Sequence, residues 1–470
     1  MPKKHTASKK FTSVFNANRA KKATSLESIA KKPTSAHLLK FALPTILSML
    51  IFSTFGIVDG IFVSRLIDPI ALSAVGLVYP FMAFVMAFGF MMGVGGNALV
   101  AKKIGAGREK EGRENFSLIV LVAFVVCLAL TFLGMLFPDF ILGILGVDTY
   151  IRDMALAYLQ PMLWFSPIVI LGMIFQQFLI TVGKAHYSTI MAVVGGLSSA
   201  GLNYVFIYLL DMGLRGAALA TNIGFSMTFM VGLVYFTFNR SSTVHFVRPK
   251  WDFRALGRTA VNGASEMVTM LATTITSVLM NNILMGLENG GHMAVGAASI
   301  MFGGMGIFAA LFLGYSSGVA PITSYNYGKG DKENLKKAFA NSLRLVGVLS
   351  IFSISLAFLF RDLLISIYGI PVGTPMHDMA RTGLMFLAGG FIFMGFNTFA
   401  SMFFTALNNG IVSSVLSLFR TLIFVVIAIL TLPAIFGLNG AWAAMPVAEV
   451  LGIVMTVTFF KMMKKKYGYA

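Results

Sequence analysis

Ionisable residues inside long apolar segments are the part of this sequence best placed to carry chemistry. Asp59 lies in FGIVDGIFVSRL, Glu266 lies in VNGASEMVTML, and Arg420 and Glu449 lie in two later apolar segments. A charge at the centre of a bilayer costs roughly 2.5–3.5 kcal/mol on insertion scales, so such residues should face the protein interior. There they should be paired with an opposite charge or able to bind a proton.

Asp59 has no basic neighbour within its own segment, because Arg65 stands six residues further on, toward the end of the segment. A buried carboxylate without a cation can bind a proton or a sodium ion, and its release rearranges the local hydrogen bonds. Such a residue is the smallest element that couples an ion gradient to transport. We predict that Asp59 binds the coupling ion, which is a proton or sodium.

The three other charges allow more than one interpretation. Arg420 and Glu449 can form a structural ion pair, or Glu449 can act in transport, and the sequence leaves both open. Glu266 stands beside Gly263 and Ser265, whose small side chains would let a ligand approach it. An anionic site favours cationic, lipophilic ligands, to which Phe, Tyr and Met side chains add adaptable contacts. We expect small organic cations as ligands.

Sequence patterns of known catalytic sites are absent. There is no GxxxxGK[ST] nucleotide-binding pattern and no HExxH zinc pattern. The single Cys127 lies in an apolar run and is expected to be a packing residue. The histidines are expected to be interfacial or solvated: His5, His37, His186, His245, His292 and His377. We predict that the chain is not an enzyme and needs no cofactor beyond its coupling ion.

The elements that position these residues are expected to be transmembrane helices. Of the 470 residues, 57% are hydrophobic and only 11% are charged, whereas soluble domains carry roughly 25% charged residues. Each crossing needs about 20 apolar residues. The twelve expected spans are 38–64, 72–100, 116–145, 154–181, 187–210, 213–238, 261–285, 292–325, 338–368, 379–405, 411–435 and 437–462. We predict an all-α integral membrane protein.

Basic residues indicate the orientation of these spans. They gather in residues 1–37 and after the second, sixth, eighth and last spans, and the intervening loops hold few of them. By the positive-inside rule, both termini are expected in the cytoplasm and the protein in the cell (inner) membrane. The net charge of +18 therefore reflects topology and not a nucleic-acid partner. We expect a monomer surrounded by membrane lipid.

Two sequence landmarks recur at nearly one spacing. GNALVAKKIGAGREKE and SSGVAPITSYNYGKGDKE align Gly105 with Gly328, an offset of 328 − 105 = 223. GLRGAALAT from Gly213 and GLNGAWAAM from Gly437 give 437 − 213 = 224. Two homologous six-helix lobes with the same membrane orientation follow. The expected parts are a disordered basic tail 1–37, lobes 38–238 and 261–463, a cytoplasmic linker 239–260 and a basic tail 464–470.

With these motifs in view, the chain resembles the multidrug and toxic compound extrusion (MATE) family across 38–462. The resemblance rests on LPTILSMLIFSTFGIVDGIFVSRL, AVGLVYP, GNALVAKKIGAGREKE, FLITVGKAHYSTI, LNYVFIYLLDMGLRGAALAT and GLNGAWAAMPVAE. The stretch NGASEMV is similar to a bacterial subgroup that includes the MepA-type exporters.

The resemblance implies a V-shaped fold of two six-helix bundles that exports organic cations in exchange for sodium ions or protons. It maps the intramembrane aspartate of the first span onto Asp59 and an asparagine of the fifth span onto Asn203. Many relatives carry a second aspartate where this sequence has Ile207, so their ion-site geometry does not transfer directly. The polar residues expected around Asp59 are Tyr79, Gln177, Thr181, Asn203, Thr221 and Asn222.

Other functions fit this sequence less well than a drug antiporter does. A flippase of lipid-linked precursors from the same superfamily should have a cationic cavity, whereas Asp59 and Glu266 make this one anionic. A membrane-embedded enzyme would need clustered His, Asp or Ser at one membrane face. A channel or a receptor is less favoured, because the two-lobe repeat is better explained by a transporter that works by alternating access.

Overall fold

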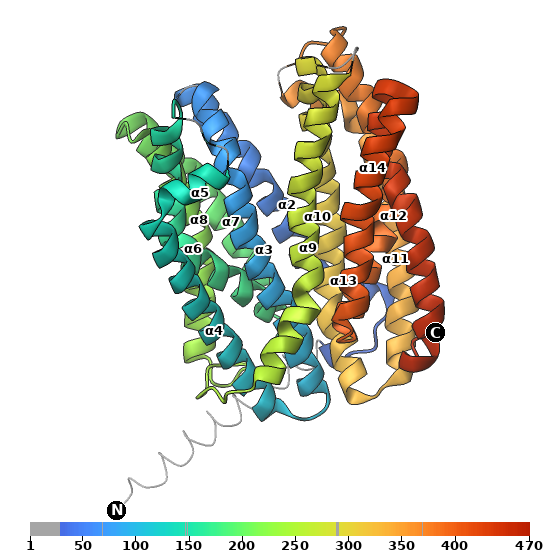
Figure 1. The fold of residues 1–470 in the computed structure, drawn as a ribbon. Coiled ribbons are helices and arrows are strands. Elements are labelled where there is room, and N and C mark those ends of the chain that lie inside the picture. The colour runs from blue at the N-terminus through green and yellow to red at the C-terminus, as the bar shows by residue number, and fades with distance from the viewer. Residues whose placement is uncertain (1–28, 68, 146, 148, 288–290, 369) are drawn as a thin grey trace, which may run out of the picture.

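The computed structural model describes residues 29–470 except 68, 146, 148, 288–290 and 369. Most of the expected tail 1–37 therefore lies outside the described residues. The described chain forms helices and contains no strand. Their labels below follow Figure 1.

The first half of the chain forms the N-terminal lobe. Its elements are α2 (Ser35–Leu66), α3 (Pro69–Gly105), α4 (Glu109–Leu136), the short α5 (Pro138–Ile144), α6 (Arg152–Thr181), α7 (Ala185–Asn203), the π-helix η1 (Tyr204–Leu209) and α8 (Gly213–Phe238). Since η1 continues α7 directly, these elements make six long helices.

The second half forms the C-terminal lobe. Its elements are α9 (Phe253–Gly286), α10 (Gly291–Lys329), α11 (Lys332–Ile367), α12 (Pro375–Ala406), α13 (Gly410–Leu418), the π-helix η2 (Phe419–Ile423) and α14 (Phe424–Tyr467). Helix α9 begins at Phe253, earlier than the expected start of the lobe at 261, because the Asp252 side chain accepts a hydrogen bond from the Ala255 amide and caps the helix.

Eleven segments of the described chain are long and apolar enough to cross a membrane. The last of them, Gly410–Tyr467, has 58 residues, which at 1.5 Å per residue is about three times what one crossing needs. Gly437 interrupts it with φ 58° and ψ −137°, a conformation that side chains other than glycine rarely adopt. The segment therefore makes two crossings, and the predicted class, about twelve transmembrane helices in two six-helix bundles, is confirmed.

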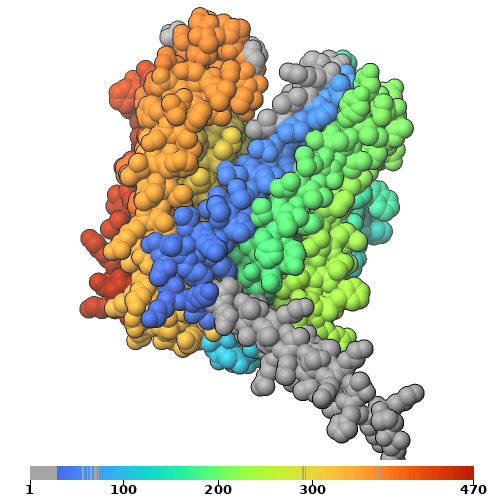
Figure 2. All heavy atoms as spheres, turned by 180° about the vertical axis from the view of Figure 1, so that it is seen from behind, coloured from blue at the N-terminus to red at the C-terminus, as the bar shows by residue number. Residues whose placement is uncertain are grey.

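The two lobes form a V (Figure 1). They meet at the lower end of the view, where α14 ends, and diverge at the upper end. We call the first the closed end and the second the open end. Seen from behind, a furrow separates the lobes at the open end (Figure 2). Helices α3 and α10 are the central elements, because α3 packs against α9 and α10, and α10 packs against α2.

A pair of glycines joins the lobes at the closed end. A Cβ atom on Gly105 would collide with the backbone carbonyl of Tyr325, and one on Gly328 would collide with that of Lys102. These two contacts are related by the internal repeat, since Lys102 and Tyr325 also stand 325 − 102 = 223 residues apart. The same kind of backbone contact joins α3 to α9, where Gly263 lies against the carbonyl of Met91. Because glycine has no side chain, the helix backbones can approach each other closely at these positions.

Candidate functional site

Asp59 on α2 lies at a buried polar centre of the N-terminal lobe. Its Oδ1 accepts hydrogen bonds from Asn203 Nδ2 at 2.8 Å and from Ser199 Oγ at 3.4 Å. Its Oδ2 accepts one from Thr221 Oγ1 at 2.7 Å. Among the described residues, no basic side chain pairs with Asp59. Its carboxylate is therefore stabilised by neutral donors.

Local helix geometry brings these donors to Asp59. Asn203 is the last residue of α7, and the wider π-helical turn of η1 follows it. π-Helical turns inside helices are frequently found at functional sites. Thr221 lies on α8, five residues after Gly216, in the small-residue stretch GAALAT. Ser199 is a neighbour that the sequence analysis missed, although it lies one turn before Asn203 on α7.

This centre offers oxygen atoms from three helices. The Asn203 Oδ1 atom is buried and has no hydrogen-bond partner in the part of the chain that the structure describes. Together with the Asp59 carboxylate and the Thr221 hydroxyl, it provides the hard oxygen ligands that alkali and alkaline-earth cations prefer. Among the described residues there is no group of three or more His, Cys, Asp or Glu side chains that could hold a metal ion. A cation here would rest on one carboxylate and neutral oxygens.

The other residues expected around Asp59 lie elsewhere. Tyr79 on α3 is 57% exposed and lines the cavity described below. Thr181 donates a hydrogen bond to Asn97, and Gln177 packs beside Gly93 with neither atom of its amide paired. These two α6 residues miss Asp59 because α6 packs mainly on α3, α8 and α4, not on α2. Asn222 donates to Ala218 O, since successive residues on a helix point about 100° apart.

A second polar centre lies in the C-terminal lobe. Arg420 Nη1 on η2 is 3.5 Å from Glu449 Oε1 on α14, so the structure brings together the pair proposed from the sequence. Arg420 Nη1 also donates to Thr398 Oγ1 at 2.9 Å, and Asn397 Nδ2 donates to Glu449 Oε2 at 2.7 Å. Both α12 residues were missed, because neutral amides and hydroxyls in an apolar sequence give no signal of their partners.

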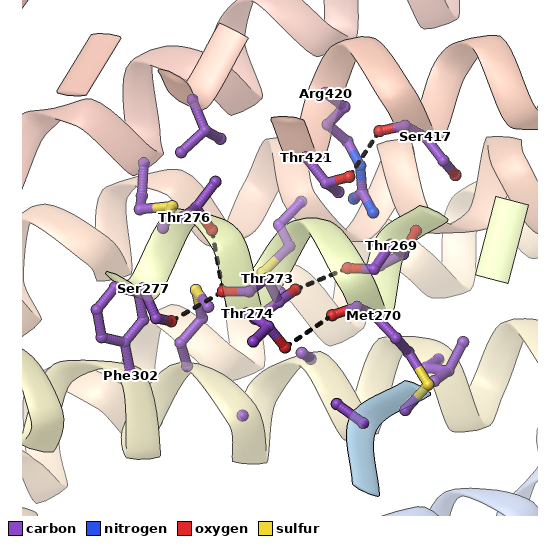
Figure 3. A pocket seen from close by; sticks show the side chains of 18 of the residues that line it. Thr269, Met270, Thr273, Thr274, Thr276, Ser277, Phe302, Ser417, Arg420 and Thr421 are labelled. Carbon is purple, nitrogen blue, oxygen red and sulfur yellow. Dashed lines mark hydrogen bonds between the residues drawn. The ribbon is translucent and has the colours of Figure 1, made fainter. Parts of the chain in front are cut away.

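Between the lobes lies a cavity of about 580 Å³. One wall comes from α3 and includes Tyr79, Met86 and Phe90. Threonine and serine residues of α9 also line the cavity, and their hydroxyls donate to backbone carbonyls of their own helix: Thr269, Thr273, Thr274, Thr276 and Ser277 (Figure 3). Glu266, Arg420 and Glu449 line the same cavity.

Asp59 is not among the described residues that line this cavity. The molecule thus separates an isolated carboxylate centre inside one lobe from a larger cavity between the lobes.

One histidine is not solvated as expected. His377, in the first turn of α12, is 3% exposed, because the helix start packs against the end of α11. Its Nδ1 lies 3.5 Å from Asp378 and its Nε2 lies 3.9 Å from Asp362. Of the two environments expected for the histidines, interfacial or solvated, burial excludes the solvated one for His377.

Two transmembrane lobes with a cavity between them and an ionisable side chain within the spans of each define a multi-pass membrane transporter. The sequence model of the MatE family matches residues 44–209 and 266–430, one stretch in each lobe and together well over half of the chain. The chain belongs to the MatE family, which confirms the resemblance seen in its motifs.

Relatives and solved structures agree. The chain is 23% identical over 433 residues to multidrug export protein MepA of Staphylococcus aureus strain MRSA252, covering 90% of this chain and 92% of that protein. A crystal structure of MATE in complex with MaL6 matches with a TM-score of 0.88 at 19% identity, covering 95% of this chain and 99% of that one. An outward-facing multidrug resistance MATE family transporter of the MOP superfamily matches with a TM-score of 0.87 at 19% identity, covering 94% and 98%.

Proposed function

We propose that this protein is a secondary antiporter that exports amphipathic organic cations in exchange for protons or sodium ions. The observation that carries the proposal is Asp59, a partly buried carboxylate that accepts hydrogen bonds from three neutral donors and pairs with no described cation. Such a group can take up a cation and release it again without first breaking an ion pair. The similarity to a multidrug export protein supports the direction of transport.

The transported molecule would bind in the cavity between the lobes. Its α3 wall is apolar and aromatic, its α9 wall carries hydroxyl groups, and its charges are two carboxylates and one guanidinium. A cavity of this composition suits a flat or flexible apolar body that carries positive charge. An anionic lipid-linked precursor would be repelled by the acidic excess, so the flippase alternative gains no support.

We propose that transport proceeds by alternating access, and that the described conformation faces outward. The closed end carries Lys102, Lys329 and Lys464–Lys466, which the positive-inside rule places in the cytoplasm together with both termini. The open end and the furrow in Figure 2 would then face the outside of the cell membrane. Rocking of one lobe against the other would close this end and open the other.

The test is dye efflux from liposomes that contain the purified protein, with sodium and pH gradients imposed separately. We expect one of the two gradients to drive accumulation of an organic cation on the far side of the membrane. Substrate-induced release of the same ion, measured without a gradient, would identify the coupling ion independently. Transport that proceeds equally well without either gradient would refute antiport.

A further inference from the structure

The cavity between the lobes is lined by three charged side chains. Glu266 comes from α9, Arg420 from η2 and Glu449 from α14, and each of them lines the cavity. Figure 3 shows the Arg420 side chain extending from η2 toward Thr269 on α9. Their formal charges of −1, +1 and −1 sum to −1.

Two of the three charges are held in place by α12. Thr398 accepts a hydrogen bond from Arg420 at 2.9 Å, and Asn397 donates both to the Glu449 carboxylate and to its backbone carbonyl, at 2.7 and 2.9 Å. Asn397 is itself fixed by a hydrogen bond from Thr456 at 2.9 Å. Arg420 and Glu449 therefore form a rigid cation–anion pair at the cavity wall.

Glu266 differs from both. Its side chain has no hydrogen-bond partner among the described residues, and the residue is 7% exposed. Arg420 lines the same cavity, and its Nε atom is buried with no hydrogen-bond partner among the described residues. An unpaired buried carboxylate that faces a cavity is stabilised by any cation that enters beside it.

We propose that Glu266, Arg420 and Glu449 form a cation subsite that accepts one positive charge, and that Arg420 sets this number. Arg420 acts as a tethered cation that already neutralises Glu449. A ligand with one charge balances the remaining carboxylate, whereas a second charge would meet the guanidinium. This inference rests on the proposed export of organic cations, and it specifies the charge of the preferred molecules.

The inference can be tested by equilibrium binding of ethidium and propidium to the purified full-length protein. The two dyes share one ring system, but ethidium carries one positive charge and propidium carries two. Arg420→Gln makes the summed charge of the three positions more negative, −2 in place of −1. We expect the ratio of the two dissociation constants to shift in favour of propidium by about tenfold or more, the size of a charge coupling of ~1.4 kcal/mol.

Companion variants separate charge from folding. Arg420→Lys keeps the charge and should keep the wild-type ratio. The double variant Arg420→Gln with Glu449→Gln returns the cavity to −1 and should restore that ratio. Arg344→Gln removes an exposed arginine of α11 that does not line the cavity, and it should change nothing.

Failure of this inference can be distinguished from failure of the proposed function. If wild-type protein binds neither dye, cation export and this inference are both overturned. If both dyes bind but Arg420→Gln leaves the ratio unchanged, or the double variant does not reverse its shift, the charge-counting role of Arg420 is overturned alone. A shift in Arg420→Gln that the double variant reverses supports the subsite.

Discussion

The two lobes stabilise partly buried carboxylates by different means. In the N-terminal lobe, Asp59 accepts hydrogen bonds from neutral side chains and is paired with no described cation. In the C-terminal lobe, Glu449 lies 3.5 Å from Arg420 and is also bound by Asn397. A carboxylate of the first kind can exchange a small cation freely, whereas one of the second kind is already balanced. We infer that ion coupling belongs to the N-terminal lobe and charge selection of the ligand to the C-terminal lobe.

The internal repeat makes this difference more informative. At the offset of 224, the counterpart of Glu449 in α8 is 449 − 224 = 225, which is Phe225. Its ring stacks on Phe52 at 5.8 Å and lies 5.5 Å from Phe55. The same place in the two bundles thus holds an aromatic cluster in one lobe and an ion pair in the other. The scaffold is shared, and the chemistry has diverged.

The largest expected effect is on Asp59. Asp59→Asn keeps the size of the side chain but removes the charge that a coupling ion needs, so gradient-driven export should fall to background while folding is retained. Dye efflux at equal expression measures the first and thermal melting measures the second. Asp153→Asn is the matched control, since its side chain is 95% exposed. If the Asp59→Asn variant transports dye at the normal rate, ion coupling does not belong to the N-terminal lobe.

The Arg420–Glu449 ion pair of the C-terminal lobe should contribute to the stability of the folded protein. Breaking a buried pair typically costs about 3–5 kcal/mol, because the remaining charge is stranded. Arg420→Met and Glu449→Gln should each lower the melting temperature, and the double variant should recover part of the loss. Additive destabilisation would show that the two residues do not act as a pair. A double variant that is stable but inactive would assign Glu449 a part in transport.

Glu266→Gln tests the ligand site of the same lobe. The substitution keeps the shape of the side chain but removes the carboxylate that no described group binds. The affinity for cationic ligands should therefore fall by about tenfold, or ~1.4 kcal/mol. The affinity for neutral ligands of similar shape should change little. Competition binding to the purified protein compares the affinities for the two kinds of ligand. An equal loss for both kinds of ligand would point to a structural role for Glu266.

The smallest effect is expected at Thr221. Thr221→Val is nearly isosteric and removes the 2.7 Å hydrogen bond to Asp59, which is worth roughly 1 kcal/mol. The ion concentration for half-maximal transport should change by about fivefold, with the maximal rate retained. Thr431→Val on α14 is the control, because its hydroxyl bonds to its own helix and the residue does not line the cavity. If both variants behave alike, Thr221 does not tune the ion site.

The fold was predictable because it depends on long apolar segments and on a repeat, both of which are local properties of a sequence. The lone carboxylate Asp59 stood out for the same reason. Which side chains surround it depends on helix rotation and on which helices touch, so Gln177 and Thr181 were placed wrongly around it while Asn203 and Thr221 do meet it. The π-helical segments η1 and η2 shift the register of their helices, and no pattern in the sequence predicted them.

The paired glycine contacts at the closed end have a kinetic consequence. Gly105 with Tyr325 and Gly328 with Lys102 are copies of one contact, related by the internal repeat. A rotation between the lobes that separates one copy separates the other at the same moment, so the packing energy of both is lost in a single step. Interfaces of this kind have discrete states and do not deform gradually. Half-released states should therefore be short-lived, and water should have little time to connect the two sides of the membrane.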